Sequence, residues 1–429
     1  MTGVEYPFRF TGVWNYYAHV LIFGLIYLEW SFSALVAWKI PGMITIIAMF
    51  CLISPLLFKA GKAEFDKGSL ILFLLMAALV LLSCLRDGDW SNNLLLLTVI
   101  TVGFVIAAFF SPSEFGRVFG NVVLFLAVIS LPIFVLAVLA PGVIDRLPLL
   151  ASSYMNQAGT QVHNAIFAVG VTHSLSSRNL GIAWEPGAFS ILLCVALYLA
   201  LLFPRKRNTL RVIILIITEL TTLSTMGIAV MCAILLVMFS GNRSARRSVV
   251  ASIIAMALLV ISALGLADSI FNTLFSKLDG LFSTSQTLAV TTQDRLNAVV
   301  YPLRAFTEAP VFGVGYERFI DINVNQCGGV ATNTFANWLA LMGGLYGIPC
   351  VLFYLRAVYK GLKKIGTNWL VTVVAIGASA LMLSTEDLIR ISLAYVFVFY
   401  GSSGLLSGST LATGPVGGCD ACRRMGAAS

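Results

Sequence analysis

The chain has 429 residues, of which 59% are hydrophobic and only 11% are charged, and its mean hydropathy is +0.93. A soluble domain of this length cannot bury so much apolar surface, so the composition excludes a soluble protein and predicts a polytopic integral membrane protein. The formal net charge of +8 is explained by basic loops that face anionic headgroups, and nucleic acid is not expected as a partner.

Apolar segments of about 20 residues predict membrane-spanning helices, because the alternating pattern of a closed barrel does not occur in this chain. Short charged or Pro/Gly-marked gaps separate these segments. In chain order, the unambiguous spans are 19–37, 40–58, 68–85, 93–110, 118–140, 187–203, 248–267, 334–355, 367–383 and 388–406.

The region 210–239 is too long for one ordinary span and short for two, and its middle, 219–227, is polar. One crossing would place the basic cluster at 243–247 opposite the other basic loops, whereas two crossings place all of these loops on one side. Since basic loops face the cytoplasm, the sequence predicts two short helices here. The prediction is about 12 helices in all, with both termini cytoplasmic.

Two outer connections, at about 141–186 and about 268–333, are much longer than the others. We therefore predict an all-α fold with one transmembrane domain over residues 1–408 and two large outer loops. Residues 409–429 are expected to form a flexible cytoplasmic tail. In that tail Cys419 and Cys422 form a lone CxxC, which is a weak zinc signal, so neither a metal site nor a cofactor is expected.

The first outer loop ends in the stretch 178–187, where Arg178 and Glu185 precede an apolar run. Ionisable groups at such a boundary are costly and usually functional. Glu185 has two interpretations, as an N-cap that the helix dipole favours or as a catalytic carboxylate. His163 and His173 lie in the same loop and are interpreted either as solvated side chains or as a source of a general base.

The second outer loop contains Arg295, Arg304 and Arg318. Arginine suits phosphate because its planar fork donates two parallel hydrogen bonds and keeps its charge. The alternative is that these side chains are merely solvated or paired. The segment 295–307 has helical spacing and is expected to lie flat on the membrane.

Two further polar segments have alternative interpretations. Hydroxyls at 221–225 either satisfy backbone groups at a helix turn or line a cavity, and Glu219 is expected to pair with an arginine of the outer loops. Glu386, Asp387 and Arg390 on the last short outer turn either pair with each other or close the floor of the cavity.

Four motifs resemble the O-antigen polymerase and O-antigen ligase superfamily. They are Arg-x-x-Gly-x-x-x-Glu-Pro-Gly at 178–187, Thr-Thr-Leu-Ser-Thr-x-Gly at 221–227, Pro-Val-Phe-Gly-Val-Gly-Tyr at 310–316, and the segment 332–347 that begins Thr-Asn-Thr-Phe-Ala-Asn. The resemblance covers about residues 178–356 and rests on the order of the motifs and their placement on outer loops.

This resemblance implies a metal-independent glycosyltransferase of the GT-C type, inverting or retaining, that acts on undecaprenyl-pyrophosphate-linked glycans at the periplasmic face of a bacterial inner membrane. Arg178 and Arg295 are expected to hold the pyrophosphate, with Arg304 and Arg318 as further candidates, because cations stabilise the leaving group. Glu185 is expected to orient Arg178 or to accept a proton from the acceptor hydroxyl. Further substrate contacts are expected from His163, Tyr316, Asn333 and Asn337.

The resemblance leaves the reaction open between two activities. Family ligases tend to have His-Asn where this chain has Thr332-Asn333, and a neutral hydroxyl is a poor general base. The chain is therefore expected to be a polymerase of O-antigen, capsule or exopolysaccharide repeat units, with a chain-length regulator as a possible partner. The alternatives are a ligase that transfers glycan to lipid A-core, and a transporter or flippase of lipid-linked oligosaccharide.

Overall fold

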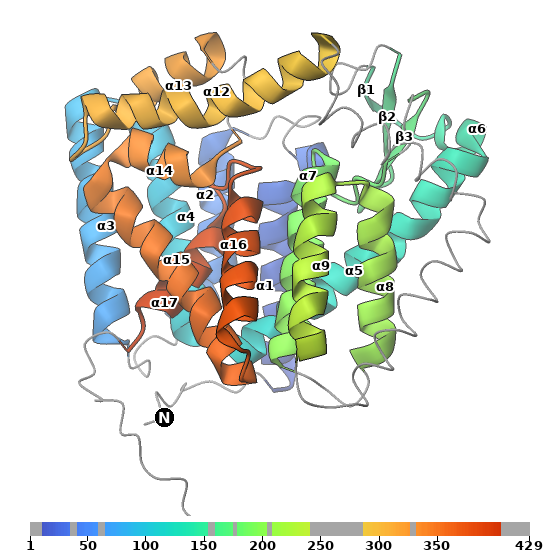
Figure 1. Ribbon diagram of the computed structural model, residues 1–429, viewed down its shortest axis with the longest axis horizontal. Coiled ribbons are helices and arrows are strands. Elements are labelled where there is room, and N and C mark those ends of the chain that lie inside the picture. The colour runs from blue at the N-terminus through green and yellow to red at the C-terminus, as the bar shows by residue number, and fades with distance from the viewer. Residues whose placement is uncertain are drawn as a thin grey trace, which may run out of the picture.

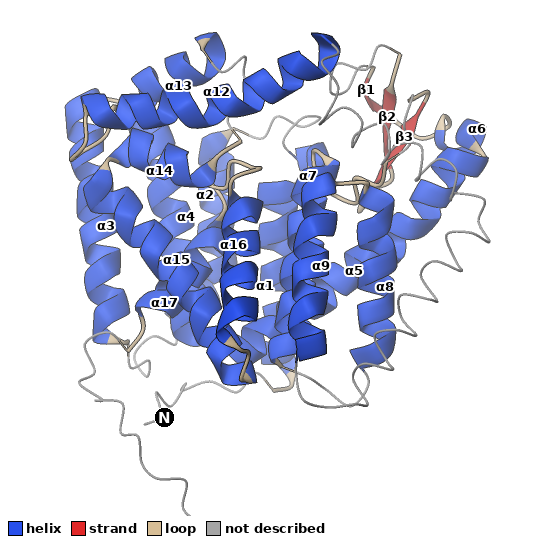
Figure 2. Cartoon of the chain, viewed as in Figure 1, coloured by secondary structure: helices blue, strands red, loops and turns tan. Residues whose placement is uncertain are grey.

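The computed structural model describes residues 11–34, 41–58, 65–152, 159–174, 178–203, 208–240, 286–326 and 332–404, and helices predominate there. Most of these helices run side by side in a bundle (Figures 1 and 2). The predicted span 248–267 and the tail 409–429 lie outside the described residues. The helices are α1 (Val13–Trp30), α2 (Gly42–Leu57), α3 (Lys67–Asp87), α4 (Trp90–Phe109), α5 (Pro112–Leu139), α6 (Pro141–Ile144), α7 (Pro186–Leu202), α8 (Asn208–Thr222), α9 (Thr225–Ser240), α12 (Gln286–Glu308), α13 (Gly315–Asn325), α14 (Thr334–Met342), α15 (Gly344–Ile365), α16 (Trp369–Leu383) and α17 (Ser392–Ser402).

Every other predicted span overlaps at least one helix. Among the described helices, α3, α4 and α5 are long and apolar enough to cross a membrane, and α2, α7, α9, α16 and α17 contain shorter apolar helices. Exposed apolar side chains such as Ile47, Leu74 and Val373 lie on the outside of the bundle. Such surfaces are unfavourable in water, and together with the three long helices they support membrane association.

The ambiguous region 210–239 forms two helices, as predicted, and the chain turns between α8 and α9. Leu223 lies at this turn with a positive φ of 51°, a conformation that few residues other than glycine adopt. The predicted span 334–355, in contrast, contains two helices. The break lies at Gly343, whose φ is 75°.

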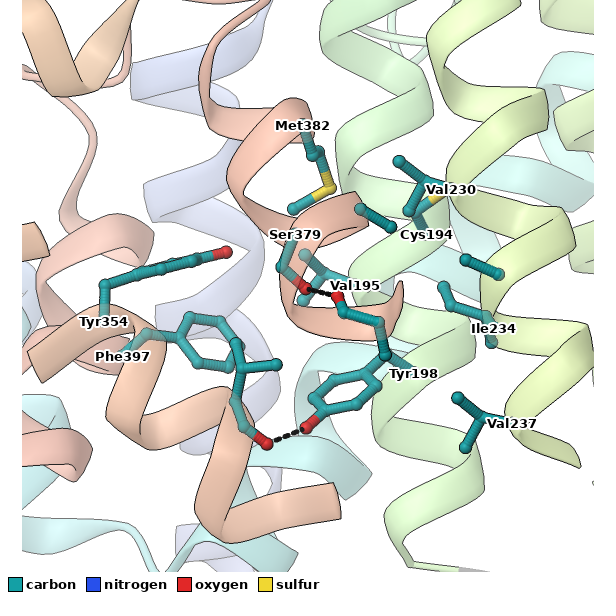
Figure 3. Close-up of a pocket in the computed structure, with 14 residues that line it drawn as sticks. Cys194, Val195, Tyr198, Val230, Ile234, Val237, Tyr354, Ser379, Met382 and Phe397 are labelled. Carbon is teal, nitrogen blue, oxygen red and sulfur yellow. Dashed lines mark hydrogen bonds between the residues drawn. The ribbon is translucent and has the colours of Figure 1, made fainter. Parts of the chain in front are cut away.

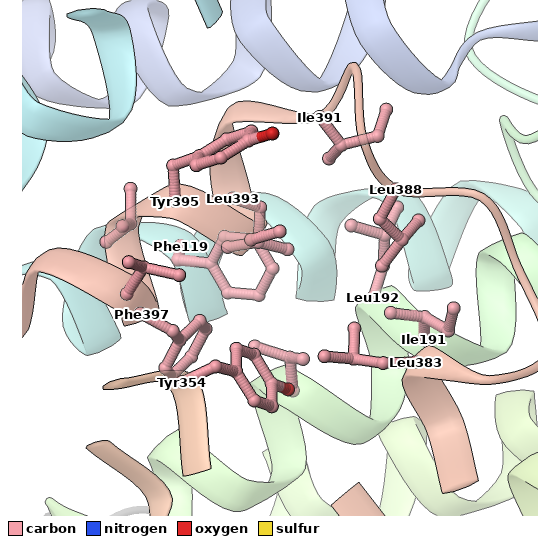
Figure 4. Close-up of a cluster of buried hydrophobic side chains, with 14 of the residues drawn as sticks. Phe119, Ile191, Leu192, Tyr354, Leu383, Leu388, Ile391, Leu393, Tyr395 and Phe397 are labelled. Atoms are coloured by element: carbon pink, nitrogen blue, oxygen red, sulfur yellow. The ribbon is translucent and has the colours of Figure 1, made fainter. Parts of the chain in front are cut away.

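One large cluster of buried apolar side chains extends from α1 to α17. Figure 4 shows part of it, with Phe119, Leu192, Tyr354 and Tyr395 drawn from α5, α7, α15 and α17. The Tyr395 hydroxyl accepts hydrogen bonds from Trp338 Nε1 (3.1 Å) and from the Tyr346 hydroxyl (2.9 Å). A buried hydroxyl is costly without partners, so this network fixes the relative positions of α14, α15 and α17.

The first outer loop is not only helical, and the all-α prediction is wrong there. It contains a three-stranded antiparallel sheet of order β1-β2-β3, with strands Leu149–Ala151, Gln161–Asn164 and Val169–Thr172. Val162, Val169 and Val171 pack with Phe32 and Leu180 in a small separate core. β-branched residues such as these three valines favour strands.

The helices α12 and α13 lie across one end of the bundle, at the same end as the sheet (Figure 1). The predicted helical segment 295–307 falls within α12 and is confirmed as a helix. This end therefore holds the described parts of both long loops, and the N-terminal side of α1 lies at the opposite end.

A carboxyl group from α1 caps the N-terminus of α17. Glu29 Oε2 accepts hydrogen bonds from the backbone N–H and the hydroxyl of Ser392, both at 3.0 Å, and Glu29 is buried. The cap residue of α17 itself, Ile391, provides no side-chain hydrogen bond. Helix N-termini leave unpaired N–H groups that such an acceptor satisfies.

We expect Glu29→Ala to lower the free energy of unfolding by about 1–3 kcal/mol, because it leaves buried donors of Ser392 without an acceptor. Thermal unfolding of the detergent-solubilised protein measures this loss. Glu29→Gln is the matched control, since it keeps one acceptor oxygen. Equal unfolding temperatures for wild type and Glu29→Ala would contradict the proposed cap.

Candidate functional site

The loop between α16 and α17 connects the starts of α7 and α14. The Thr334 hydroxyl, at the start of α14, donates to the Glu386 carbonyl oxygen and accepts from the Leu388 N–H at 2.9 Å. The Glu386 carboxyl group lies against Gly187, in the first turn of α7. Three segments that are distant in the sequence therefore meet at this point.

Glu185 and Glu386 share the space beside Gly187. A Cβ atom added at Gly187 would lie 2.6 Å from Glu386 Oε1 and 3.5 Å from Glu185 Oε1, so the glycine leaves room beside the buried Glu386 side chain. Glu185 occupies the N-cap position of α7, but its side chain makes no cap hydrogen bond. The predicted N-cap position of Glu185 is therefore confirmed without a side-chain cap hydrogen bond, and the Glu185 and Glu386 carboxyl groups both lie close to Gly187.

Asp387 follows Glu386 in the loop that contacts the start of α14, the helix that carries Asn337. Asn337 is fully buried, and its side chain lies next to the Asp387 carboxyl group. Burial raises the pKa of Asp387, and this rise is opposed by the Ile389 N–H, by Asn337 and by Arg390. Glu185, Glu386, Asp387 and Asn337 together are called the carboxylate site below.

Tyr316, predicted to bind substrate, lies next to this loop. The Arg390 guanidinium carbon is 5.1 Å from the centroid of the Tyr316 ring, a cation–π distance. Arg390 also donates to Asn92 Oδ1 at 2.8 Å, so it contacts other elements instead of only pairing with the acids of its own loop. Burial raises the pKa of Tyr316 to about 12, which keeps its hydroxyl protonated near neutral pH.

Asn333, another predicted substrate ligand, is the N-cap of α14. Its side-chain oxygen accepts from the Ala336 N–H at 2.9 Å, and the residue is buried. Capping by asparagine is a common structural role. Asn333 therefore positions the helix that carries Asn337.

Arg304 and Arg318 line one hollow between α12 and α13, and its volume is about 400 Å³. Tyr301, Glu308 and Gln326 contribute to the same lining. Arg318 Nη1 also pairs with Asp321 Oδ2 at 2.9 Å. The structure thus brings two of the predicted arginines together, and this arginine hollow has the dimensions and donors for a phosphorylated group.

Arg178 is not among the described residues that line this hollow. Arg178 Nε and Nη2 donate to the carbonyl oxygens of Thr222 and Leu223 at 3.1 and 3.3 Å, so Arg178 holds the α8–α9 turn. Arg295 belongs to α12, but its side chain lies outside the described residues.

Two of the sequence motifs pack directly against each other. The Val314 N–H donates to the Ala340 carbonyl oxygen and the Gly344 N–H to that of Pro310, both at 2.8 Å. A Cβ atom at Gly313 would lie 2.3 Å from the Leu341 carbonyl oxygen. The glycines therefore allow the loop before α13 to seat on the α14–α15 break, which places Tyr316 beside the carboxylate site.

His163 lies in the small sheet and not in the carboxylate site. Its Nδ1 lies 3.0 Å from the Leu147 carbonyl oxygen, and its Nε2 lies 3.2 Å from Thr172 Oγ1 and 3.4 Å from Asp145 Oδ1. His173 Nε2 lies 3.3 Å from the other Asp145 oxygen. This cluster joins β2 and β3 to the end of α6, so the structure supports a structural role for His163.

The Asp145 cluster predicts a pH dependence of stability. The Thr172 hydrogen bond, followed by His173 and His163, lowers the pKa of Asp145. A lowered pKa stabilises the fold above the unfolded value of about 4, and this contribution is lost as pH falls through the folded pKa. We expect wild type and Asp145→Asn to differ in unfolding temperature at neutral pH. This difference should disappear once the pH is below the folded pKa of Asp145. A difference that persists in acid would contradict this assignment.

The polar turn between α8 and α9 has its hydroxyls engaged with the main chain. Thr222 Oγ1 donates to the Glu219 carbonyl oxygen, and Ser224 Oγ accepts from the Gly227 N–H. Glu219 itself accepts from Ser190 Oγ at 2.6 Å, so the expected arginine partner is replaced by a serine of α7. These contacts favour the interpretation of the segment as a structural helix turn.

An apolar pocket lies between α7, α9, α15, α16 and α17 (Figure 3). The hydroxyls of Tyr198 and Ser379 on its wall donate to the main-chain carbonyl oxygens of Val358 and Ala375. The wall therefore presents mainly carbon atoms and suits an apolar ligand better than a polar reactant.

Within the described residues, no three His, Cys, Asp or Glu side chains are grouped to hold a metal ion. No protein-family model matches the chain, and no curated protein matches it.

The carboxylate pair was not foreseen from the sequence. Its only signals were Glu185-Pro-Gly187 and the acidic turn at Glu386.

Proposed function

We propose that the protein is a polymerase of lipid-linked polysaccharide repeat units. It transfers a growing glycan from undecaprenyl pyrophosphate to a new lipid-linked repeat unit at the outer face of the bacterial inner membrane. The observation that carries this proposal is the shared space of Glu185 and Glu386 at the end of an apolar helical bundle, with the arginine hollow at the same end.

Glycan transfer gives a role to the carboxylate site and another to the arginine hollow. The acceptor hydroxyl must lose a proton as the glycosidic bond forms, and a carboxylate is a suitable general base. The departing pyrophosphate gains negative charge as its bond to the sugar breaks, and Arg304 and Arg318 offer guanidinium donors for that charge. Within this proposal, Glu185 is the base, and Asn337 and Tyr316 orient sugar hydroxyls.

Thr332 supports polymerisation over ligation, because this chain has no histidine at the position where related ligases tend to have one. A deletion strain of the source bacterium separates the two reactions. A lipid A-core that bears one repeat unit indicates a polymerase. A bare core with accumulated lipid-linked polymer indicates a ligase.

A transporter is the second candidate, and the break between α14 and α15 at Gly343 favours it. Discontinuous helices are typical of transporter binding sites. Purified protein in liposomes, supplied with a lipid-linked repeat unit and no nucleotide sugar, distinguishes the activities. Lengthening of the glycan supports the polymerase, whereas translocation without lengthening rejects it.

A further inference from the structure

A second cationic pocket lies at the end of the bundle opposite the sheet and α12. It is formed by the start of α5, the last turns of α7 and the start of α8, and its volume is about 320 Å³. Among the described residues, its polar lining consists of Ser113, Arg117 and Arg211. The other described lining residues are glycine or apolar, namely Gly116, Leu199, Ala200, Leu202 and Phe203.

Neutral groups from α1 and α5 hold the two arginines in place. Arg117 donates to Asn15 Oδ1, and Arg211 donates to Asn121 Oδ1. His19 Nδ1 lies 2.7 Å from the main-chain carbonyl oxygen of Asn15, and His19 Nε2 lies 3.0 Å from Asn121 Nδ2. The guanidinium groups of Arg117 and Arg211 bring positive charge to the pocket, and the two amide oxygens help to fix their positions.

Small residues on α5 make room for this arrangement. A Cβ atom at Gly116 would lie 3.1 Å from the Phe203 ring, and one at Gly120 would lie 3.6 Å from Arg211 Nη1. The Lys364 ammonium group lies 4.8 Å from the centroid of the Phe203 ring and adds a further cation nearby. Glu114, one turn before Arg117, accepts a hydrogen bond from the Ser111 hydroxyl.

We infer that this inner pocket binds the phosphate of an anionic phospholipid from the membrane leaflet at this end of the bundle. The shared chemistry is a phosphate group held by Arg117 and Arg211. The apolar wall of Leu199, Leu202 and Phe203 favours a lipid source over free phosphate, since an acyl chain covers that wall. Basic pockets between membrane helices commonly bind anionic headgroups in this way.

Native mass spectrometry of the full-length protein, titrated with phosphatidylglycerol in detergent, tests the inference. We expect one tight binding step that Arg117→Gln with Arg211→Gln weakens about 30-fold. The matched control is Lys67→Gln with Lys363→Gln, which removes two exposed cations outside the pocket. We expect the control to change the affinity by less than about threefold.

A second variant, Ala200→Phe, fills the pocket and keeps the arginine network, so it tests the site even if the arginine variants do not fold. It should also abolish the tight step. Unchanged binding in both Ala200→Phe and a folded arginine variant would overturn the inference, as would an equal loss in the lysine control. Displacement of phosphatidylglycerol by a modest excess of inorganic phosphate would assign the pocket to a soluble anion instead.

Discussion

Glu185→Gln is expected to lower the rate of polymer formation about 10²- to 10⁴-fold, the contribution typical of a general base. The amide keeps the size of the side chain but does not accept a proton from the acceptor hydroxyl. Glu185 makes no cap hydrogen bond in α7, so the unfolding temperature should stay close to that of wild type. The assay is lengthening of a lipid-linked repeat unit by purified protein in liposomes.

Glu317→Gln is the control for this substitution, because Glu317 is an exposed acid of α13. It should retain wild-type activity. Glu386→Gln removes the charge of the other glutamate beside Gly187. Its rate of polymer formation tests whether the Glu386 carboxyl group influences Glu185 as the base. Full activity of Glu185→Gln would remove this residue from the mechanism and would leave Glu386 as the candidate base.

The double variant Arg304→Gln with Arg318→Gln is expected to lower the rate of polymer formation by about 10³-fold or more, because each donor to a developing charge typically contributes about 10² to 10³. The loss should fall mainly on kcat, since the charge on pyrophosphate grows as the bond to the sugar breaks. Single variants should show intermediate losses. Rates over a range of repeat-unit concentrations separate kcat from KM.

Arg146→Gln is the matched control for the arginine hollow. Arg146 is an exposed arginine that follows α6 near the sheet, and it does not line the hollow. If Arg146→Gln lowered the rate of polymer formation equally, the rate would depend on the total positive charge at this end of the bundle and not on the arginine hollow. A double variant with wild-type kcat would reject the proposed role of Arg304 and Arg318.

The sequence predicted the helical segments well because their signals are local. The length and apolar composition of α3, α4 and α5 are properties of single segments, and the division of 210–239 followed from its polar middle and from charge placement. The sheet was missed because strands of three and four residues, Leu149–Ala151 and Gln161–Asn164, give too short a pattern to recognise. These strands are stabilised by a core that includes Phe32, more than a hundred residues earlier.

The composition and periodicity of the sequence by themselves predicted a mostly helical chain with apolar helices long enough to cross a membrane. The place of Glu185 before an apolar run singled it out, and the resemblance of the motifs to the polymerase and ligase superfamily added Tyr316 and Asn337 as candidate residues. Only the tertiary structure placed Glu386 against Gly187 and put Arg304 and Arg318 in one hollow. The physical reason is that helix formation depends on neighbours along the chain, whereas these contacts depend on how separate helices pack, and no local pattern encodes that packing.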